Sequence, residues 1–280
     1  MPELPEVECL RRSLEPHLVG RTVARATLRR ADIHESCDDG AHRGTRRGLL
    51  QGCTIDRIDR RGKQLAIISA QGPALCVHLG MTGQLLFTNA QPPLAPHTHA
   101  VWTLEQGGRP AGTLAFRDPR RFGGLWSFPT AEALIDHRLA ALGPDALSVT
   151  ADQLSVALSG VHRHVKAALL DQGRLAGVGN IYADEALFVA GIRPKRPAHA
   201  LKPAQIDALA SAIRQVLSRS IETGGSTLRD YVDANGRAGS SQHSHAVYGR
   251  AGEPCLRCAK TLKTAQVAQR TTVWCQTCQQ

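Results

Sequence analysis

The chain has 280 residues, a formal net charge of +10 and a pI of about 9.6. Its apolar fraction of 42% is sufficient for buried cores, but aromatic residues make up only 4%, so those cores must be aliphatic. No apolar run approaches membrane-spanning length and no signal segment opens the chain, so we expect a soluble, cytoplasmic protein. The excess of positive charge favours a polyanionic partner.

The first residues contain a potential nucleophile. Removal of Met1 would leave Pro2 with a free secondary amine, and an α-amino group with a pKa of roughly 7.7–8.0 is partly unprotonated near neutral pH. Such an amine attacks carbonyl-like carbons and forms a cationic iminium. Glu3 beside it is a ready proton donor or acceptor. Most chains that begin with Met-Pro make no chemical use of it, so the dipeptide alone is weak evidence.

A helix is predicted directly after this dipeptide. Pro5 suits a first helical turn, and Val7, Leu10 and Leu14 form one apolar stripe that ends before Gly20. The N-terminus is therefore tied to a helix that can pack on a core, and an amine held in this way can be aimed at a substrate.

The region from 22 to about 128 has short β-like runs separated by Gly, Pro and Asn. We predict strands that include residues 54–58, 64–69, 74–77, 101–104, 113–116 and 124–128. Many short strands without intervening helices favour a sandwich or a barrel, with the N-terminal helix covering one edge or face.

From about residue 131 the apolar residues recur at helical spacing. We predict helices at 131–141, 151–158, 161–171, 181–190 and 203–222. A change of pattern near 142–144 indicates a domain boundary, and after residue 225 the chain is polar and irregular. We therefore expect three domains, at 1–142, 143–236 and 237–280.

The cysteines divide into two groups. Four are scattered and are expected to be ordinary reduced thiols: Cys9, Cys37, Cys53 and Cys76. Four form a C-x2-C-x16-C-x2-C pattern at the end of the chain: Cys255, Cys258, Cys275 and Cys278. This spacing is typical of a tetrahedral zinc site, and four thiolates leave no open coordination position. We predict one Zn²⁺ ion with a structural role.

Residues 237–280 hold six Lys or Arg residues and one acidic residue, so half of the net charge lies in this tail. Upstream of it, 177–183 links two predicted helices by a glycine-rich turn, with Asn180 as the expected N-cap and the helix N-terminus facing a phosphate. Helix, glycine turn, helix and a basic zinc hairpin together predict a clamp on the DNA backbone.

Five motifs occur in order: PELPEVE at 2–8, HLGMTG at 78–83, DPRRFG at 118–123, GVGNIYA at 177–183 and the four terminal cysteines. Together they closely resemble the bacterial formamidopyrimidine-DNA glycosylase, or 8-oxoguanine DNA glycosylase, family, essentially from end to end. The LPEV sequence at 4–7 and Met81 favour it over the sister endonuclease VIII family, which acts on oxidised pyrimidines. The resemblance implies an α+β multidomain protein with an N-terminal β-sandwich and helix, a helix–two-turn–helix domain and a C-terminal zinc-finger β-hairpin.

The resemblance also implies a bifunctional DNA glycosylase/AP lyase. Pro2 would attack C1′ of a flipped nucleotide, the base would leave, and the iminium would allow β- and δ-elimination. Glu3 would act as general acid and base, Glu6 would support this geometry, and Lys63 would contact phosphate and assist the lesion chemistry. The expected partner is duplex DNA that contains oxidised purines or abasic sites, bound by a monomer at the bacterial nucleoid without membrane contact.

Further residues of the resemblance concern DNA. Four match phosphate contacts: His78, Asn180, Tyr248 and Arg270. Lys166 is placed among the DNA-binding residues as well. Three match the residues that fill the hole left by the flipped base: Met81, Arg120 and Phe122. An aromatic residue next to arginines and glycines suits a wedge against stacked bases.

Two stretches depart from the family pattern. Residues 239–242 (GSSQ) replace a loop that commonly carries an aromatic or bulkier residue and closes over the extruded base, which leaves the lesion preference open. Residues 162–164 (HRH) stand where lysine- or arginine-rich sequence is usual, which would weaken a phosphate contact or make it pH-dependent.

Alternatives remain at this stage. Lys63 is the rival Schiff-base former, although its ordinary pKa would leave it protonated unless it is buried. The protein could instead be an oxidised-pyrimidine glycosylase of the sister type or a catalytically dead protein that recognises lesions or bends DNA. A catalytic zinc hydrolase is disfavoured because all four zinc positions are filled.

Overall fold

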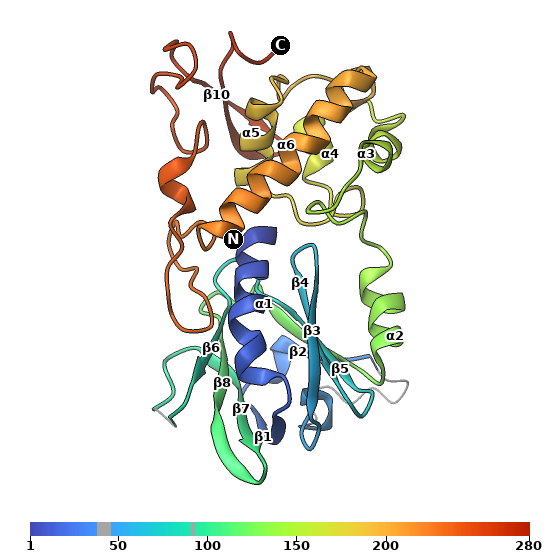
Figure 1. Ribbon diagram of the computed structural model, residues 1–280, viewed down its shortest axis with the longest axis vertical. Helices are drawn as coiled ribbons and strands as arrows, with labels where there is room; N and C mark the ends of the chain where they lie inside the picture. Colours follow the sequence, from blue (N-terminus) through green and yellow to red (C-terminus); the bar gives the residue numbers. More distant parts are fainter. Residues whose placement is uncertain (38–45, 91–92) are drawn as a thin grey trace. The chain divides into compact units, whose positions relative to one another are not determined.

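The computed structural model describes residues 1–37, 46–90 and 93–280, and these form two compact units (Figure 1). Unit 1 contains residues 1–141 and 224–239, and unit 2 contains residues 142–223 and 240–280. Residues 224–239 belong to unit 1 because the backbone N–H of Phe87 donates to Ala234 O at 2.8 Å and the N–H of Ala234 donates to Ser13 Oγ at 3.0 Å.

Within the described residues, unit 1 holds two β-sheets. The first has the order β1 (Thr22–Leu28), β7 (Thr98–Gln106), β8 (Arg109–Arg117) and β6 (Gln84–Thr88). The second has the order β2 (His34–Ser36), β9 (Gly124–Phe128), β5 (Ala74–His78), β4 (Gln64–Ser69) and β3 (Ile55–Arg61). Neighbouring strands are antiparallel except for β2 and β9, which are parallel.

The two sheets share one aliphatic core. Leu104 and Phe116 from the first sheet cluster with Leu65 and Val77 from the second, and all four side chains are buried. Two sheets that bury their inner faces on one another form a sandwich, which confirms the predicted architecture. The predicted strands β4 and β9 have the expected bounds, whereas β7 and β8 extend beyond the predicted runs because they pair with each other over most of their length.

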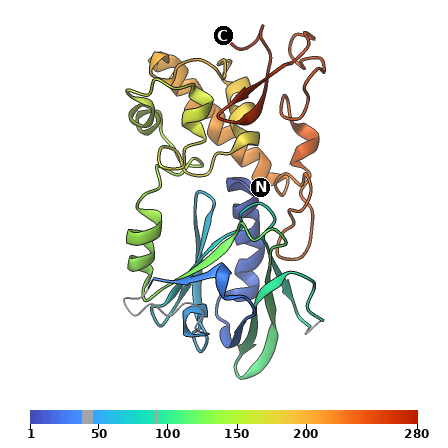
Figure 2. The ribbon, with the colours of Figure 1, turned by 180° about the vertical axis from the view of Figure 1, so that it is seen from behind.

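Helix α1 (Leu4–Leu18) packs on this core and contacts strands of both sheets (Figures 1 and 2). Leu10 and Leu14 are buried in the cluster, as the apolar stripe predicted. Pro16 lies in the last turn, and Gly20 follows with a φ of +78°, a conformation that glycine adopts without strain. The helix that carries the N-terminal residues is therefore fixed along its whole length.

The segment after β9 departs from the prediction. Helix α2 (Ala131–Leu134) passes into a π-helical turn, η3 (Ile135–Leu139), in place of one regular helix over 131–141. Within η3 the guanidinium of Arg138 lies 3.6 Å from the centroid of the Trp126 ring. Short 3-10 helices, η1 (Ala31–Ile33) and η2 (Arg46–Leu49), complete the described elements of unit 1.

Unit 2 is mainly helical and ends in a hairpin. Its described elements are α3 (Ala151–Leu158), α4 (Val165–Leu169), α5 (Asn180–Val189), η4 (Ala198–Ala200), α6 (Pro203–Glu222), η5 (Ser241–Ser244), β10 (Lys263–Val267) and β11 (Arg270–Trp274). Helices α3 and α6 have the predicted bounds. Leu262, Val273 and Cys275 of the hairpin region cluster with Phe188 of α5, so the hairpin packs on the helical part of unit 2.

The predicted helix at 161–171 is wrong at its N-terminal end. Residues 161–164 are extended and hydrogen-bond to residues 196–199, for example from the N–H of Ala198 to Arg163 O and from the N–H of His199 to Val161 O, both at 3.0 Å. Tertiary pairing satisfies these backbone groups, so the helix begins only at Val165. Among the described residues, no helix has the length and apolar character needed to cross a bilayer.

Candidate active site and DNA-contact residues

The N-terminal cluster consists of Pro2, Glu3 and Glu6, all of them buried. The backbone N–H of Glu3 donates to Glu6 Oε2 at 2.8 Å, as part of a capping box at the start of α1. Met1, about half exposed, precedes Pro2, so the secondary amine is formed only after Met1 is removed. The capping box fixes the direction in which that amine leaves the helix.

Glu6 is also held by the returning segment of unit 1. Its Oε1 accepts from the N–H of Ser226 at 2.7 Å, next to Gly225, which has a φ of +82°. A Cβ at Gly225 would lie 3.1 Å from Glu6 Oε1, so glycine permits this close approach. The Glu6 carboxylate thus connects Glu3 to a segment more than 200 residues away in the sequence.

Lys63 lies in the tight turn between β3 and β4, where Arg61 pairs with Gln64. Its side chain is buried, and Gly62 before it has a φ of +55°. Gln64 pairs with His78 at the end of β5, so Lys63 and His78 lie at neighbouring strand ends of one sheet. The two residues that the sequence placed 15 positions apart are therefore brought together at one sheet edge.

His78 is a neutral imidazole at physiological pH. Burial, together with the positive charges of Arg138 and Lys63, lowers its pKa to about 4. Its Nδ1 accepts from the backbone N–H of Gly80 at 3.2 Å, which leaves the Nε2–H as the donor. His78 can therefore donate a hydrogen bond to a phosphate oxygen without carrying a charge.

Two loops of unit 1, at 79–83 and 118–123, are locked together. A Cβ on Gly80 would lie 2.3 Å from Gly123 N, so only glycine fits between the two backbones. Asp118 is fully buried, and its carboxylate accepts from Thr82 Oγ1 at 2.5 Å and from the N–H of Gly123 at 2.8 Å. One carboxylate therefore fixes both loops.

The locked loops present large side chains to solvent. Met81 is 38% exposed and Phe122 is 57% exposed, and the guanidinium of Arg120 lies 4.7 Å from the Phe122 ring centroid. Arg121, which lies between Arg120 and Phe122, has a φ of +55°, in the left-handed region that is uncommon for a non-glycine residue. A rigid pair of loops with one exposed aromatic, one methionine and a cation suits insertion into a base stack.

In unit 2, Asn180 is not the N-cap that the sequence predicted. Gly179 occupies the N-cap position of α5, and Asn180 is the first helical residue. The Asn180 Nδ2 donates to Thr271 O at 3.1 Å, next to the exposed Arg270 in the hairpin. The contact uses the Nδ2 donor of the side-chain amide, whereas capping would have used its Oδ1 acceptor, and it places Asn180 beside Arg270.

The structure contradicts the expected DNA contact of Lys166. Its side chain has no exposed surface, and its Nζ lies 2.7 Å from Asp184 Oδ1. The same Nζ donates to Thr272 Oγ1 at 2.8 Å and to Thr271 O at 3.1 Å. An enclosed ammonium cannot touch DNA, so the predicted DNA contact of Lys166 is wrong.

The terminal cysteines form a metal site. All four Sγ atoms lie within 4.8 Å of one another: Cys255, Cys258, Cys275 and Cys278. Cys255 Sγ is 3.9 Å from Cys278 Sγ and Cys258 Sγ is 3.4 Å from Cys275 Sγ. A Zn–S bond of about 2.3 Å in a tetrahedron requires sulfur atoms about 3.8 Å apart, so these thiolates fit Zn²⁺.

Three family models match successive parts of the chain. Residues 1–125 match the formamidopyrimidine-DNA glycosylase N-terminal domain, residues 142–232 match the formamidopyrimidine-DNA glycosylase H2TH domain, and residues 252–280 match the zinc finger found in FPG and IleRS. The curated formamidopyrimidine-DNA glycosylase of Moorella thermoacetica is 44% identical over 265 residues, 94% of each chain. The chain belongs to the formamidopyrimidine-DNA glycosylase family.

Solved structures of family members have the same fold. The crystal structure of the MutM (FPG) protein from Thermus thermophilus is 42% identical, with a TM-score of 0.85 over 99% of this chain and 98% of that one. A Lactococcus lactis FPG variant in complex with DNA containing Fapy-dG is 30% identical, with a TM-score of 0.88 over both full chains.

Sequence reasoning missed several buried acids of this family member. Glu185 accepts from three consecutive backbone N–H groups, those of Ala246, Val247 and Tyr248, at 2.8–2.9 Å, and so it holds the segment that carries Tyr248. Asp184 beside it pairs with Lys166. Charged residues inside an otherwise apolar helix pattern are the signal that could have revealed them, because buried acids require partners.

In the loop at 239–242, a close backbone contact requires a glycine at position 239. A Cβ at Gly239 would lie 2.1 Å from Gly225 O, so no larger residue fits in this backbone conformation. The N–H of Gly239 donates to Thr227 Oγ1 at 2.8 Å. The 3-10 helix η5 begins two residues later, at Ser241.

The remaining cysteines match the expectation of reduced thiols. None of the four takes part in a disulfide within the described part of the chain: Cys9, Cys37, Cys53 and Cys76. Burial raises the pKa of Cys9 to about 12 and that of Cys76 to about 11, so both remain protonated. Neither is therefore a candidate for nucleophilic catalysis.

Proposed function

We propose that this family member acts through the amine of Pro2 as a bifunctional DNA glycosylase/AP lyase that removes oxidised purines, among them 8-oxoguanine and formamidopyrimidines, from duplex DNA. The observation that carries the proposal is the capping box at the start of α1, in which Glu6 holds the residue directly after Pro2. A relative binds DNA that contains Fapy-dG, an oxidised purine, and this supports the substrate class.

The reaction begins after Met1 is removed. The lone pair of the Pro2 nitrogen attacks C1′ of the flipped nucleotide, and the bond to the damaged base breaks as the base takes up a proton. Ring opening of the sugar gives an iminium, and loss of a C2′ proton expels the 3′ phosphate. A second elimination expels the 5′ phosphate, and water releases the enzyme.

Glu3 is the general acid and base in this scheme. It is 3% exposed and adjacent to Pro2, so it can move protons at the sugar while bulk water is excluded. Glu6 is the positioning residue, because its two oxygens are occupied by the N–H groups of Glu3 and Ser226. Lys63 and His78, at neighbouring strand ends, are assigned to phosphate contact beside the lesion.

The other proposed residues bind DNA. Asn180, Tyr248 and Arg270 are assigned to phosphates, and the first and last of these are linked through the Thr271 carbonyl next to Arg270. Met81, Arg120 and Phe122 are assigned to the space that the flipped base leaves, because two locked loops expose them. In a bacterial cell this DNA is the nucleoid, where we place the enzyme.

Zinc has a structural role in this proposal. Bound Zn²⁺ joins the segments 255–258 and 275–278, which flank the β10–β11 hairpin, and so stabilises the hairpin that presents Arg270. Four thiolates fill a tetrahedral coordination sphere, so a zinc-activated water has no place and a zinc hydrolase is disfavoured.

Borohydride trapping tests the nucleophile. The full-length enzyme should form a covalent adduct with 8-oxoguanine or abasic duplex, and peptide mapping should locate it on Pro2. A variant with an uncleavable N-terminal extension should lose trapping, because the amine becomes an amide. Trapping at Lys63 in the extended variant would transfer the nucleophile to that lysine. Duplex binding without any trapping or strand cleavage would favour a catalytically dead lesion-binding protein.

A further inference from the structure

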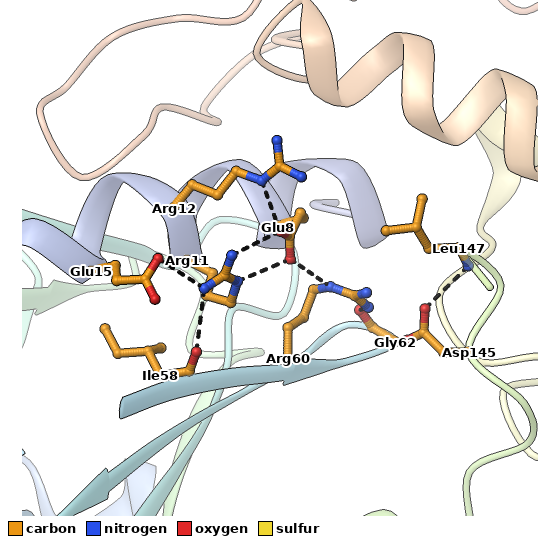
Figure 3. Close-up of polar contacts among 9 residues, drawn as sticks. All are labelled: Glu8, Arg11, Arg12, Glu15, Ile58, Arg60, Gly62, Asp145 and Leu147. Carbon is orange, nitrogen blue, oxygen red and sulfur yellow. Dashed lines mark hydrogen bonds and ion pairs between the residues drawn. The ribbon is translucent and has the colours of Figure 1, made fainter. Parts of the chain in front are cut away.

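A single buried carboxylate on α1 gathers three arginines (Figure 3). Glu8 is 6% exposed, and its oxygens accept from Arg11 at 3.1 and 3.2 Å, from Arg12 at 2.8 Å and from Arg60 at 3.0 Å. Burial by itself would raise the pKa of Glu8, but the hydrogen bonds from Arg11 and Arg12 and the charges of Arg11 and Arg60 hold it below its ordinary value. The three guanidinium groups therefore favour the ionised form of Glu8.

The three arginines are not equivalent. Arg12 is 57% exposed and its contact with Glu8 is local to α1. Arg11 bonds to Glu15 on the same helix, and its Nη1 also donates to Ile58 O in the middle of β3 at 3.5 Å, away from the turn. Arg60 comes from β3 and is only 7% exposed. Its Nε donates to Glu8 Oε2 at 3.0 Å while its Nη1 donates to Gly62 O, also at 3.0 Å. Arg60 therefore joins α1 to the turn that carries Lys63.

This link requires the shape of arginine. A guanidinium presents several donors in a rigid plane, so one side chain can hold a carboxylate and a carbonyl at the same time. An ammonium at the end of a flexible stem is a point donor without this fixed fork. Gly62, whose carbonyl is held, has a φ of +55° and is followed directly by Lys63.

We propose that Glu8 and Arg60 are positioning residues that hold the Gly62–Lys63 turn in register with the Pro2 end of α1. The inference rests on the proposed function of Pro2 and Lys63. Glu6 fixes the N-terminal end of α1 through Glu3. Glu8, two residues later on the same helix, binds Arg60 and so fixes the turn between β3 and β4. The Pro2 amine and the Lys63 turn are thus both held by the same helix, α1. The relative position of these groups matters because a displacement of about 1 Å can slow a reaction about 100-fold.

The test compares rate with affinity in the full-length, zinc-loaded enzyme. The rate is that of borohydride-trapped adduct formation on abasic duplex under single-turnover conditions, and the affinity is that for an uncleavable tetrahydrofuran duplex. We expect Arg60→Gln and Glu8→Gln to form the adduct about 10- to 100-fold more slowly. Affinity should change by no more than about threefold, because neither side chain is assigned to DNA.

Two further variants separate positioning from charge. Arg60→Lys keeps the charge but lacks the fork, so it should remain about tenfold slow or more. Arg12→Gln is the matched control: it removes an arginine from the same carboxylate without touching the hairpin, and it should stay within about twofold of the wild-type rate. The double variant Glu8→Gln/Arg60→Gln should be no slower than the slower single variant, since both remove one link.

A wild-type rate for Arg60→Lys, or equal slowing by Arg12→Gln and Arg60→Gln, would overturn the inference. Loss of duplex affinity at an unchanged trapping rate would also overturn it and assign Arg60 to phosphate binding. If circular dichroism shows that Arg60→Gln is unfolded, the rate and affinity of Arg60→Lys and Glu8→Gln are compared with those of the wild type instead. Absence of trapping in the wild-type enzyme would instead refute the proposed function, so the two failures are distinguishable.

Discussion

Lys166 Nζ lies 2.7 Å from Asp184 Oδ1, and neither side chain has any exposed surface. The pair also joins two elements of unit 2 to the zinc hairpin, because Lys166 donates to Thr272 Oγ1 and Asp184 Oδ2 accepts from the N–H of Val273. The ion pair anchors the zinc hairpin, because its remaining donors and acceptors form hydrogen bonds with hairpin residues. Lys166 therefore belongs to the architecture that presents Arg270, rather than to the DNA surface.

Removal of this lysine should destabilise the protein in a pH-dependent way. Burial raises the pKa of Asp184 to about 6 even though Lys166 opposes the shift. In Lys166→Met the pKa of Asp184 in the folded protein should rise further. Between the ordinary pKa of Asp184 in the unfolded chain and its raised pKa in the folded protein, the folded state holds a proton that the unfolded state has lost. The unfolding free energy of the variant therefore falls as the pH rises through this range. We expect a loss of about 3–5 kcal/mol in unfolding free energy at pH 8 and a smaller loss at pH 5.

Urea unfolding at both pH values measures this difference, with the exposed Lys263→Met as the control for loss of a lysine charge. An equal loss at pH 5 and pH 8 would mean that packing of the lysine stem, rather than the charge of Asp184, determines the effect.

Arg120 should determine the preference for the partner base. Met81 and Phe122 can wedge into the stack, but only a guanidinium can donate to the acceptors on the Watson–Crick edge of cytosine. Adenine presents a donor there, and the mismatch should cost about 1–3 kcal/mol, roughly tenfold to a hundredfold. We expect faster excision of 8-oxoguanine opposite cytosine than opposite adenine. Arg120→Ala should slow excision opposite cytosine far more, while cleavage of a preformed abasic site stays comparatively active. Equal losses on both pairings would locate the discrimination elsewhere.

Loss of the zinc site should weaken DNA binding while the chain outside the zinc finger stays folded. Cys258→Ser removes one of four thiolates, and in so small a module the metal supplies much of the folding energy. We expect a sharp drop in duplex affinity, while circular dichroism retains the helical signal of the rest of the chain. Metal analysis should find about one zinc per wild-type chain, and active wild-type protein without zinc would refute this role.

His78 and Arg270 should contribute to DNA binding in different ways. Burial lowers the pKa of His78 to about 4, so it stays a neutral donor at ordinary pH, whereas Arg270 is exposed and charged. Arg270→Ala should reduce the slope of log affinity against log salt concentration by about 1, and His78→Gln should leave the slope unchanged. The ratio of the His78→Gln and wild-type dissociation constants should be constant between about pH 5.5 and pH 8. A ratio that grows as pH falls would mean that His78 becomes charged on DNA.

Much of this protein could be predicted from local sequence. The apolar stripe of α1, the bounds of α3, α6, β4 and β9, and the four zinc ligands follow from periodicity, turn residues and ligand spacing. These signals act over a few residues, so the chain nearby contains all the information. The family itself was predicted from motifs and is confirmed by three family models and by a curated relative that matches the full length of the chain.

What the sequence did not determine was the fate of polar groups whose partners are remote. Residues 161–164 have helical spacing but pair with residues 196–199, Asn180 was expected to cap a helix and bonds to Thr271, and Lys166 was expected on the surface and is buried against Asp184. A polar group buried by folding must find a partner, and which partner is near depends on contacts between segments far apart in sequence. Tertiary structure alone decided these roles, and with them the link from Glu8 through Arg60 to the turn before Lys63.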